Sequence, residues 1–343
     1  MTATALPTRP ARPALSVVVP AYNEAANLPA VLAELQALLP TLSARWEVIV
    51  VDDGSRDATP MVLLPFLAQA GFRCLRLSRN FGKEAALSAG IDHAAGEVVV
   101  LMDADGQHPV ALLPAMLEAW RDGADSVYTV RRSRADESLT KRVGTWLFHT
   151  IVNVGAQMEI PRGAGDFRLL DRRVVDALKS LPERNRFMKG LYAWVGFRTQ
   201  ALPYDPPARR SGRSSYSLRR LMALAFAGLT AFTNLPLRLW SGLGAVIAFC
   251  ALGYGFYIAF DHFIEDHPVP GWPTVVTGIL FFSGVQLLSF GILGEYIGRI
   301  YDEVKQRPLY IVGSDAGFGP AVDAVVDTAA AETPPMLERA PAA

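Results

Sequence analysis

The sequence predicts an α/β protein in which one domain, built on a mostly parallel sheet, precedes a pair of long apolar helices. Two observations predict this fold. Apolar runs of strand character alternate with segments of helical spacing over residues 15–130, an order typical of parallel sheets covered by helices. Further along, two runs without a charged residue are each long enough to cross a membrane. The 343 residues give room for one large domain plus appendages.

The predicted strands and helices follow one another in a regular order. A lead, residues 1–14, is rich in Pro, Ala and Thr, lacks an apolar core and is expected to be disordered. The first apolar run, residues 15–19, ends in Pro20, Tyr22, Asn23 and Glu24. The second, residues 46–51, ends in Asp52, Asp53, Gly54 and Ser55. Helical spacing is found at residues 26–39, 59–70 and 83–94.

A third apolar run ends in Asp103, Asp105 and Gln107. Their oxygens suit a hard divalent cation, for which the phosphates of a ligand are the usual remaining partners. A lone D-x-D more often caps a helix than binds a metal. Here three such clusters follow three strands, and ligands of these sheets bind outside the carboxyl ends of the strands. The sequence therefore predicts a metal and diphosphate site at one edge of the sheet.

Several other classes of protein lack their characteristic residues in this chain. No G-x-G-x-x-G follows the first strand, which argues against a nicotinamide or flavin cofactor. There is no H-E-x-x-H, nucleophile elbow or Walker A motif, and the five histidines show no metal-ligand clustering. The formal net charge of zero gives no support to nucleic-acid binding. The two cysteines, Cys74 and Cys250, do not form a plausible disulfide framework.

The two uncharged runs, residues 239–260 and 272–294, are predicted to be transmembrane helices within a segment that covers residues 238–302. The alternative is a pair of buried helices in a soluble domain, which seldom run this long without charge. Their small residues also offer surfaces for packing into a homo-oligomer.

Charge around the two runs predicts the topology. The connector between them is acidic, whereas arginine and lysine flank them on the outer sides, so the domain and both termini are expected in the cytoplasm, at the inner membrane. Residues 211–237 suit helices at the membrane interface, with an ordinary domain helix as the alternative. Residues 303–343 are expected to form a cytoplasmic tail that is disordered and dispensable from about residue 316.

Five motifs in order, P-A-Y-N-E, V-V-D-D-G-S, N-F-G-K-E, M-D-A-D-G-Q-H-P and G-D-F-R-L-L-D-R-R, carry a resemblance to a known family. The chain resembles inverting family 2 glycosyltransferases of the GT-A fold, and most closely the branch that loads a sugar onto a polyprenyl phosphate. The resemblance covers residues 15–312. It implies a GT-A domain over residues 15–210, a nucleotide-sugar donor (a UDP-hexose is favoured), a polyprenyl (undecaprenyl) phosphate acceptor, and Mg²⁺ or Mn²⁺ as the cofactor.

The same resemblance implies roles for single residues. Asp103, Asp105 and Gln107 would hold the metal on the diphosphate, and Lys83 would meet the diphosphate at a helix start. The nucleoside pocket would be lined by Pro20, Tyr22, Glu24 and Asp53, with Asp53 accepting a hydrogen bond from the base. Phosphate contacts fall to Arg131, Arg168, Arg209 and Ser214. The chain departs from the family pattern at Ser215, where lysine is usual. One cation of the phosphate-binding loop is therefore missing unless Arg210 or Arg213 substitutes for it.

Asp105, Asp166 and Arg131 are the expected catalytic residues. An acceptor phosphate is already anionic at neutral pH, so a strong base is not required, and Asp166 could orient or deprotonate the acceptor or instead pair structurally with a nearby arginine. Two other functions stay open: a membrane polysaccharide synthase, for which two spans are few and the Q-x-x-R-W motif is missing, and a non-catalytic scaffold on the same fold.

Overall fold

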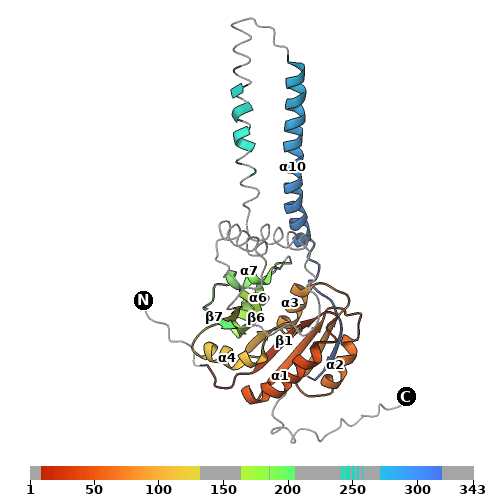
Figure 1. Ribbon diagram of the computed structural model, residues 1–343, viewed down its shortest axis with the longest axis vertical. Helices are drawn as coiled ribbons and strands as arrows, with labels where there is room; N and C mark the ends of the chain where they lie inside the picture. The colour runs from red at the N-terminus through yellow and green to blue at the C-terminus, as the bar shows by residue number, and fades with distance from the viewer. Residues whose placement is uncertain are drawn as a thin grey trace, which may run out of the picture.

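The protein is described from a computed structural model, which covers residues 9–131, 164–184, 186–204 and 271–318, with part of 240–257. Within these residues one eight-stranded sheet has the strand order β7-β5-β6-β4-β1-β2-β3-β8. Helices cover both faces of the sheet, and α10 projects away from it as a long rod (Figure 1).

The centre of the sheet is parallel, as the sequence predicts. Strand β1 (Leu15–Ala21) lies between β4 (Val98–Leu101) and β2 (Trp46–Asp52), and β3 (Phe72–Leu77) pairs in parallel with β2. These strands are rich in valine and leucine, and their buried residues divide between the two faces, because a central parallel strand is covered by helices on both sides.

The flanks of the sheet correct the expectation of a mostly parallel sheet. Strand β6 (Ala164–Asp171) runs antiparallel to both β4 and β5 (Ser126–Arg131), while β7 (Thr199–Tyr204) is parallel to β5. On the other edge, β8 (Val312–Gly317) runs antiparallel to β3. The sheet is therefore mixed: β6 and β8, which come from later parts of the chain, pair antiparallel with strands of the earlier part.

The predicted helices are present at nearly the expected positions. One face of the sheet carries α1 (Leu28–Leu42), α2 (Thr59–Leu67), the short 3₁₀ helix η1 (Val110–Leu112) and α4 (Leu113–Arg121). The other carries α3 (Lys83–His93), α6 (Arg172–Ser180) and α7 (Met188–Trp194). The second face matters most for function, since α3 and α7 both begin near the carboxyl ends of the central strands.

The described part of the lead, residues 9–14, is ordered, which corrects the prediction of a disordered segment there. The Arg9 side chain is only 6% exposed and its Nη2 lies 2.6 Å from Asp125 Oδ1. Its guanidinium also donates to the carbonyls of Trp120 and Ala124 and covers the Trp120 ring. The contacts of this one arginine hold the lead against the domain. The composition of the lead does not predict such contacts.

The start of the predicted tail is also ordered. Beyond α10 the chain returns to the domain and forms β8, which continues past residue 316 to Gly317. The Arg73 guanidinium and the Asp315 carboxylate form a two-point ion pair across β3 and β8, at 2.9 and 2.6 Å. Disorder from about residue 316 is thus wrong for residues 316 and 317, and residues 319–343 lie outside the described part.

The second apolar run forms a helix, α10 (Trp272–Val304), which is longer than the predicted 272–294. The first run lies mostly outside the described residues, as do residues 211–237. In the part of the chain that the structure describes, no helix combines the length and the apolar character that crossing a membrane requires. The two predicted crossings, 239–260 and 272–294, are therefore not confirmed.

Candidate active site

The loops after β1 and β2 are joined by hydrogen bonds at the carboxyl edge of the sheet. The Asn23 amide donates to Ser55 Oγ and the Arg56 amide to Asn23 Oδ1, both at 2.9 Å. The Glu24 amide donates to Thr59 Oγ1, also at 2.9 Å. The two polar clusters that the sequence places at these strand ends therefore form one surface, next to the half-exposed ring of Tyr22.

Asp53 connects this surface to the start of α3. Its carboxylate accepts the amide protons of Phe81 at 2.7 Å and of Gly82 at 2.9 Å. Burial raises the pKa of Asp53, and these two amides act in the opposite direction. The carboxylate thus has a structural task that the sequence did not indicate: it fixes the N-F-G-K loop, and with it the position of Lys83.

Lys83 lies at the centre of the site, between two carboxylates from different strands. Its Nζ is 2.6 Å from Asp103 Oδ1 and 2.7 Å from Asp166 Oδ2. The antiparallel pairing sets Leu101 of β4 opposite Arg168 of β6, so Asp166 lies beyond the end of β4, where Asp103 follows. Two predicted site residues that are 63 positions apart in the chain are thereby brought to one ammonium group.

A second lysine, Lys189 of α7, extends the cluster. Its Nζ lies 3.3 Å from Asp166 Oδ1, so each oxygen of Asp166 faces a different ammonium. Burial alone would raise the pKa of Asp166, but Lys83 and Lys189 outweigh it and hold that pKa well below its ordinary value. Burial likewise opposes the charge on Lys83, and Asp103 and Asp166 outweigh it and raise the pKa of Lys83. The Asp166 carboxylate and the Lys83 ammonium are therefore both charged at neutral pH.

The loop after β4 is held by a histidine that sequence reasoning missed. The Asp103 amide donates to His108 Nδ1 at 2.9 Å, and the buried His108 ring stacks on Phe167 with centroids 5.1 Å apart. Burial lowers the pKa of His108, which favours the neutral ring that accepts this hydrogen bond. In the same loop, Asp105 Oδ1 accepts the Gln107 amide at 3.0 Å. The only available signal was the position of His108 within the D-G-Q-H-P motif.

Arg168 lies under the site with its guanidinium between two tyrosines. Its Cζ is 4.3 Å from the ring centroid of Tyr192 and 5.1 Å from that of Tyr128. The residue is 3% exposed, its Nε has no hydrogen-bond partner within the described part of the chain, and burial lowers its pKa. Burial also raises the pKa of Tyr192 well above its usual range. Tyr192 and Lys189 come from α7, whose sequence carries no strand-end pattern that would have revealed them.

The structure gathers some predicted site residues and leaves others outside. Lys83, Asp103 and Asp166 meet directly, and Asp105 and Gln107 share the loop that follows Asp103. Pro20 lies in β1 opposite Val51. Arg131 ends β5 opposite Tyr204, but its side chain is not described. Arg209 and Ser214 lie outside the described residues, together with Arg210, Arg213 and Ser215.

The donor atoms of this site fit a divalent cation that arrives with a nucleotide. In the described part of the chain, no three His, Cys, Asp or Glu side chains form a metal-binding group by themselves. However, Asp103 and Asp166 already converge on one cation, the Lys83 ammonium. Mg²⁺ is commonly bound through one or two carboxylates plus the phosphates of a substrate. Asp103 and Asp105, in the same loop, are the sequence-predicted candidates for such a pair.

Comparisons with known proteins identify the family of the chain. Residues 16–179 match the family model described as glycosyl transferase family 2, and residues 235–300 match the one described as GtrB C-terminal hairpin. The chain is 43% identical over 299 residues to an uncharacterized glycosyltransferase of Synechocystis, covering 87% of this chain and 94% of the relative. The chain belongs to glycosyl transferase family 2. It is therefore an enzyme, a glycosyltransferase.

Two further likenesses illustrate this family 2 glycosyltransferase. The SfII prophage-derived bactoprenol glucosyl transferase of Shigella flexneri is 40% identical over 302 residues, which cover 87% of this chain and 97% of that protein. A crystal structure of glucosyl-3-phosphoglycerate synthase from Mycobacterium tuberculosis, solved with Mn²⁺, UDP and phosphoglyceric acid, shares 22% identity and a TM-score of 0.46. That likeness covers 66% of this chain and 85% of the other.

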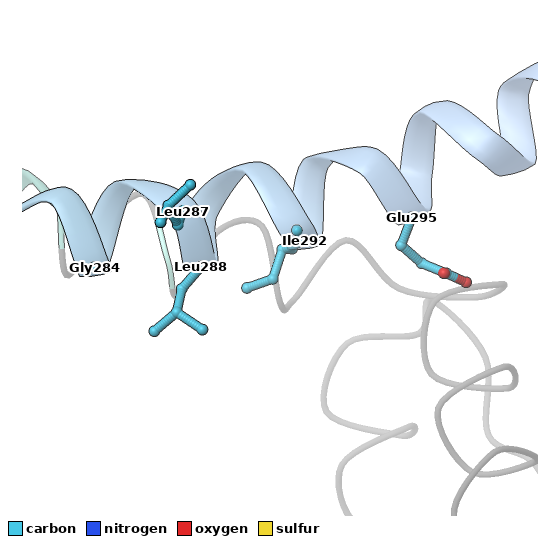
Figure 2. A pocket seen from close by; sticks show the side chains of 6 residues that line it. Gly284, Leu287, Leu288, Ile292 and Glu295 are labelled. Carbon is cyan, nitrogen blue, oxygen red and sulfur yellow. The ribbon is translucent and has the colours of Figure 1, made fainter.

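A separate hollow lies along α10, away from the acidic cluster. It is an open, mainly apolar groove of about 660 Å³, and Figure 2 shows the side chains that line it. They are Gly284, Leu287, Leu288, Gly291, Ile292 and Glu295. Four residues beyond Glu295, the Arg299 guanidinium pairs with the Glu295 carboxylate at 3.2 Å. Arg299 Nε and Nη1 are buried and have no hydrogen-bond partner among the residues that the structure describes.

Proposed function

We propose that this glycosyltransferase transfers a sugar, with inversion, from a nucleotide sugar to a polyprenyl phosphate at the cytoplasmic face of the membrane. A UDP-hexose is the favoured donor. The observation that carries the proposal is the convergence of Lys83, Asp103 and Asp166 at the carboxyl ends of the central strands. The name of the Shigella relative, a bactoprenol glucosyl transferase, supports a polyprenyl acceptor.

The donor would lie across the joined loops after β1, β2 and β4. Pro20, Tyr22, Glu24 and Asp53 would line the nucleoside pocket, and Lys83 would contact the diphosphate. Asp103, Asp105 and Gln107 would hold Mg²⁺ or Mn²⁺. When bound, such an ion neutralises charge that develops on the departing nucleoside diphosphate.

On the acceptor side, the charges favour orientation over proton transfer. A carboxylate whose pKa lies well below its ordinary value is a weak base, and Asp166 is held in that state by two lysines. A phosphate oxygen that is already anionic needs positioning instead, which can supply much of the rate. Asp166 would keep Lys83 and Lys189 in place, and Arg168, Arg131, Arg209 and Ser214 would contact phosphate groups.

The lipid acceptor requires the site to lie beside a membrane. The match of residues 235–300 to a hairpin family supports a membrane hairpin there. The described surface of α10 exposes many apolar side chains, among them Phe281, Leu287 and Ile297. We assign this face, with the groove that ends at Glu295, to contact with lipid, including the polyprenyl chain of the acceptor. Residues 211–237 would lie at the interface, and both termini would be cytoplasmic.

The test is transfer of radiolabelled sugar from a panel of UDP- and GDP-sugars to undecaprenyl phosphate by the detergent-purified protein. We expect metal-dependent glycolipid from one donor, abolished by a chelator and reduced by at least about 100-fold in Asp105→Ala, which loses one carboxylate from the donor site. If no donor yields a lipid product while a polysaccharide forms, the synthase function replaces this proposal. If no sugar is transferred at all, a non-catalytic scaffold function replaces it.

A further inference from the structure

The cation position at the heart of the donor site is filled by the chain itself. The Lys83 ammonium lies within 2.7 Å of both Asp103 Oδ1 and Asp166 Oδ2. It therefore occupies one oxygen of Asp103, a carboxylate that the divalent ion is expected to use, and two cations held at the same carboxylate repel each other. The proposed function gives Asp166 the task of holding Lys83, but it gives no role to the contact between Lys83 and Asp103.

We propose that Lys83 is an exchangeable internal cation, which holds Asp103 and Asp166 together until the metal and the nucleotide arrive. The metal takes the place of the ammonium at Asp103, and the diphosphate accepts the displaced ammonium. This inference rests on the proposed donor site and adds an exchange to it. No covalent bond changes in the exchange.

Two features of the cluster make the exchange feasible. The Lys83 side chain is 41% exposed and has a flexible four-carbon stem, so its ammonium can turn away without a movement of α3. Its backbone stays in place, because Asp53 accepts the amides of Phe81 and Gly82 just before it. Lys83 can therefore move as a side chain on a fixed helix start.

Lys189 keeps Asp166 paired while Lys83 is away. The two oxygens of Asp166 face different lysines, so departure of one ammonium leaves the other at 3.3 Å. Without Lys189, displacement of Lys83 would leave a poorly solvated carboxylate without a cation, which is costly. Lys189 is thus a positioning residue, and the cluster keeps its charge balance when a divalent ion replaces an ammonium and an anionic diphosphate follows.

The exchange predicts a specific coupling between metal and nucleotide. Metal alone must expel Lys83 without offering it a new anion, so it should bind weakly. With a diphosphate present, the displaced ammonium has a partner, and the metal should bind more tightly. Because such coupling is reciprocal, the metal should tighten the nucleotide by the same factor.

The experiment is titration calorimetry of Mn²⁺ into the full-length protein in detergent, with and without saturating UDP. For the wild type we expect at least tenfold tighter Mn²⁺ binding with UDP. In Lys83→Met, Mn²⁺ alone should bind at least tenfold more tightly than to the wild type. Lys83→Arg retains a cation between the carboxylates and should bind Mn²⁺ alone as weakly as the wild type, which also covers the case that Lys83→Met does not fold.

The matched control is Lys189→Met, which removes the same charge from Asp166 but leaves Lys83 between the carboxylates. Its affinity for Mn²⁺ alone should stay within threefold of the wild type. Equal tightening in Lys83→Met and Lys189→Met would overturn the exchange in favour of a general charge effect, and so would unchanged binding in Lys83→Met. If no form binds Mn²⁺ even with UDP, the proposed donor site fails as well.

Discussion

At the scale of single residues, Asp53 and Gly54 lie in one turn that both shapes the backbone and positions the active site. Asp53 fixes the loop before α3, and Gly54 passes so close to that loop that a Cβ would lie 2.7 Å from the carbonyl carbon of Arg79. Its φ of +70° is also one that side chains rarely adopt. Both requirements arise because the turn after β2 packs directly against the loop that precedes α3.

We therefore expect Gly54→Ala to lower the free energy of unfolding by about 3 kcal/mol, from the strained φ together with the backbone clash. Gly196 is a matched control, because its φ is +71° and the nearest atom to an added Cβ is 3.8 Å away. Gly196→Ala should cost only about 1 kcal/mol. Urea unfolding in detergent measures both, and equal losses would show that the contact with Arg79 is unimportant.

Glu84 supplies a prediction about pH. Burial, with a contribution from Asp166, raises the pKa of Glu84 from 4.5 to about 7. The folded state thus binds this proton more tightly than the unfolded state, so the stabilisation is present below pH 4.5 and is lost as the pH rises through 7. Glu84→Gln removes the titration. Relative to wild type, this variant should gain about 2 kcal/mol of stability between pH 5 and pH 8; a constant difference would contradict the assignment.

At the scale of elements, the sequence predicts those strands and helices that have a regular spacing of apolar residues. The buried strands β1, β2 and β4 and the helices between them follow from apolar runs and spacing, and the polar clusters after β1 and β2 meet as expected. Strand β8 could not be predicted, since V-G-S-D-A-G has no apolar alternation and its partner β3 lies more than 230 residues earlier. Lys189 was missed for a similar reason: only the tertiary packing of α7 brings it to Asp166.

Strand β8 gives the element-scale prediction. Ending the chain after Phe318 should leave the Tm unchanged, whereas ending it after Ile311 removes the strand that covers the edge of β3 and should lower the Tm by at least about 5 °C. Asp315→Asn separates strand pairing from the ion pair with Arg73, because a solvent-exposed pair contributes only about 0–1 kcal/mol. If Asp315→Asn lowers the Tm as much as the truncation after Ile311 does, the ion pair alone accounts for the effect.

At the scale of the whole molecule, the proposed reaction brings a soluble donor and a lipid acceptor to one charged cluster. Helix α10 leads directly back to the domain, where the Arg184 amide donates to Glu303 Oε1 at 2.9 Å, shortly before α7 and Lys189. Helix α10 is therefore linked to α7 through a short stretch of chain, residues 184–188. The sequence alone does not predict this connection, because only the folded chain brings Arg184 to Glu303.

The measurement that tests the central claim most directly is the initial rate of glycolipid formation by Asp166→Asn beside Asp315→Asn. Both variants remove one carboxylate charge that pairs with a cation, but only Asp166 belongs to the cluster with Lys83 and Lys189. We predict a loss of at least about 100-fold for Asp166→Asn and a rate within twofold of wild type for Asp315→Asn. A folded Asp166→Asn enzyme that transfers sugar at the wild-type rate would contradict the account.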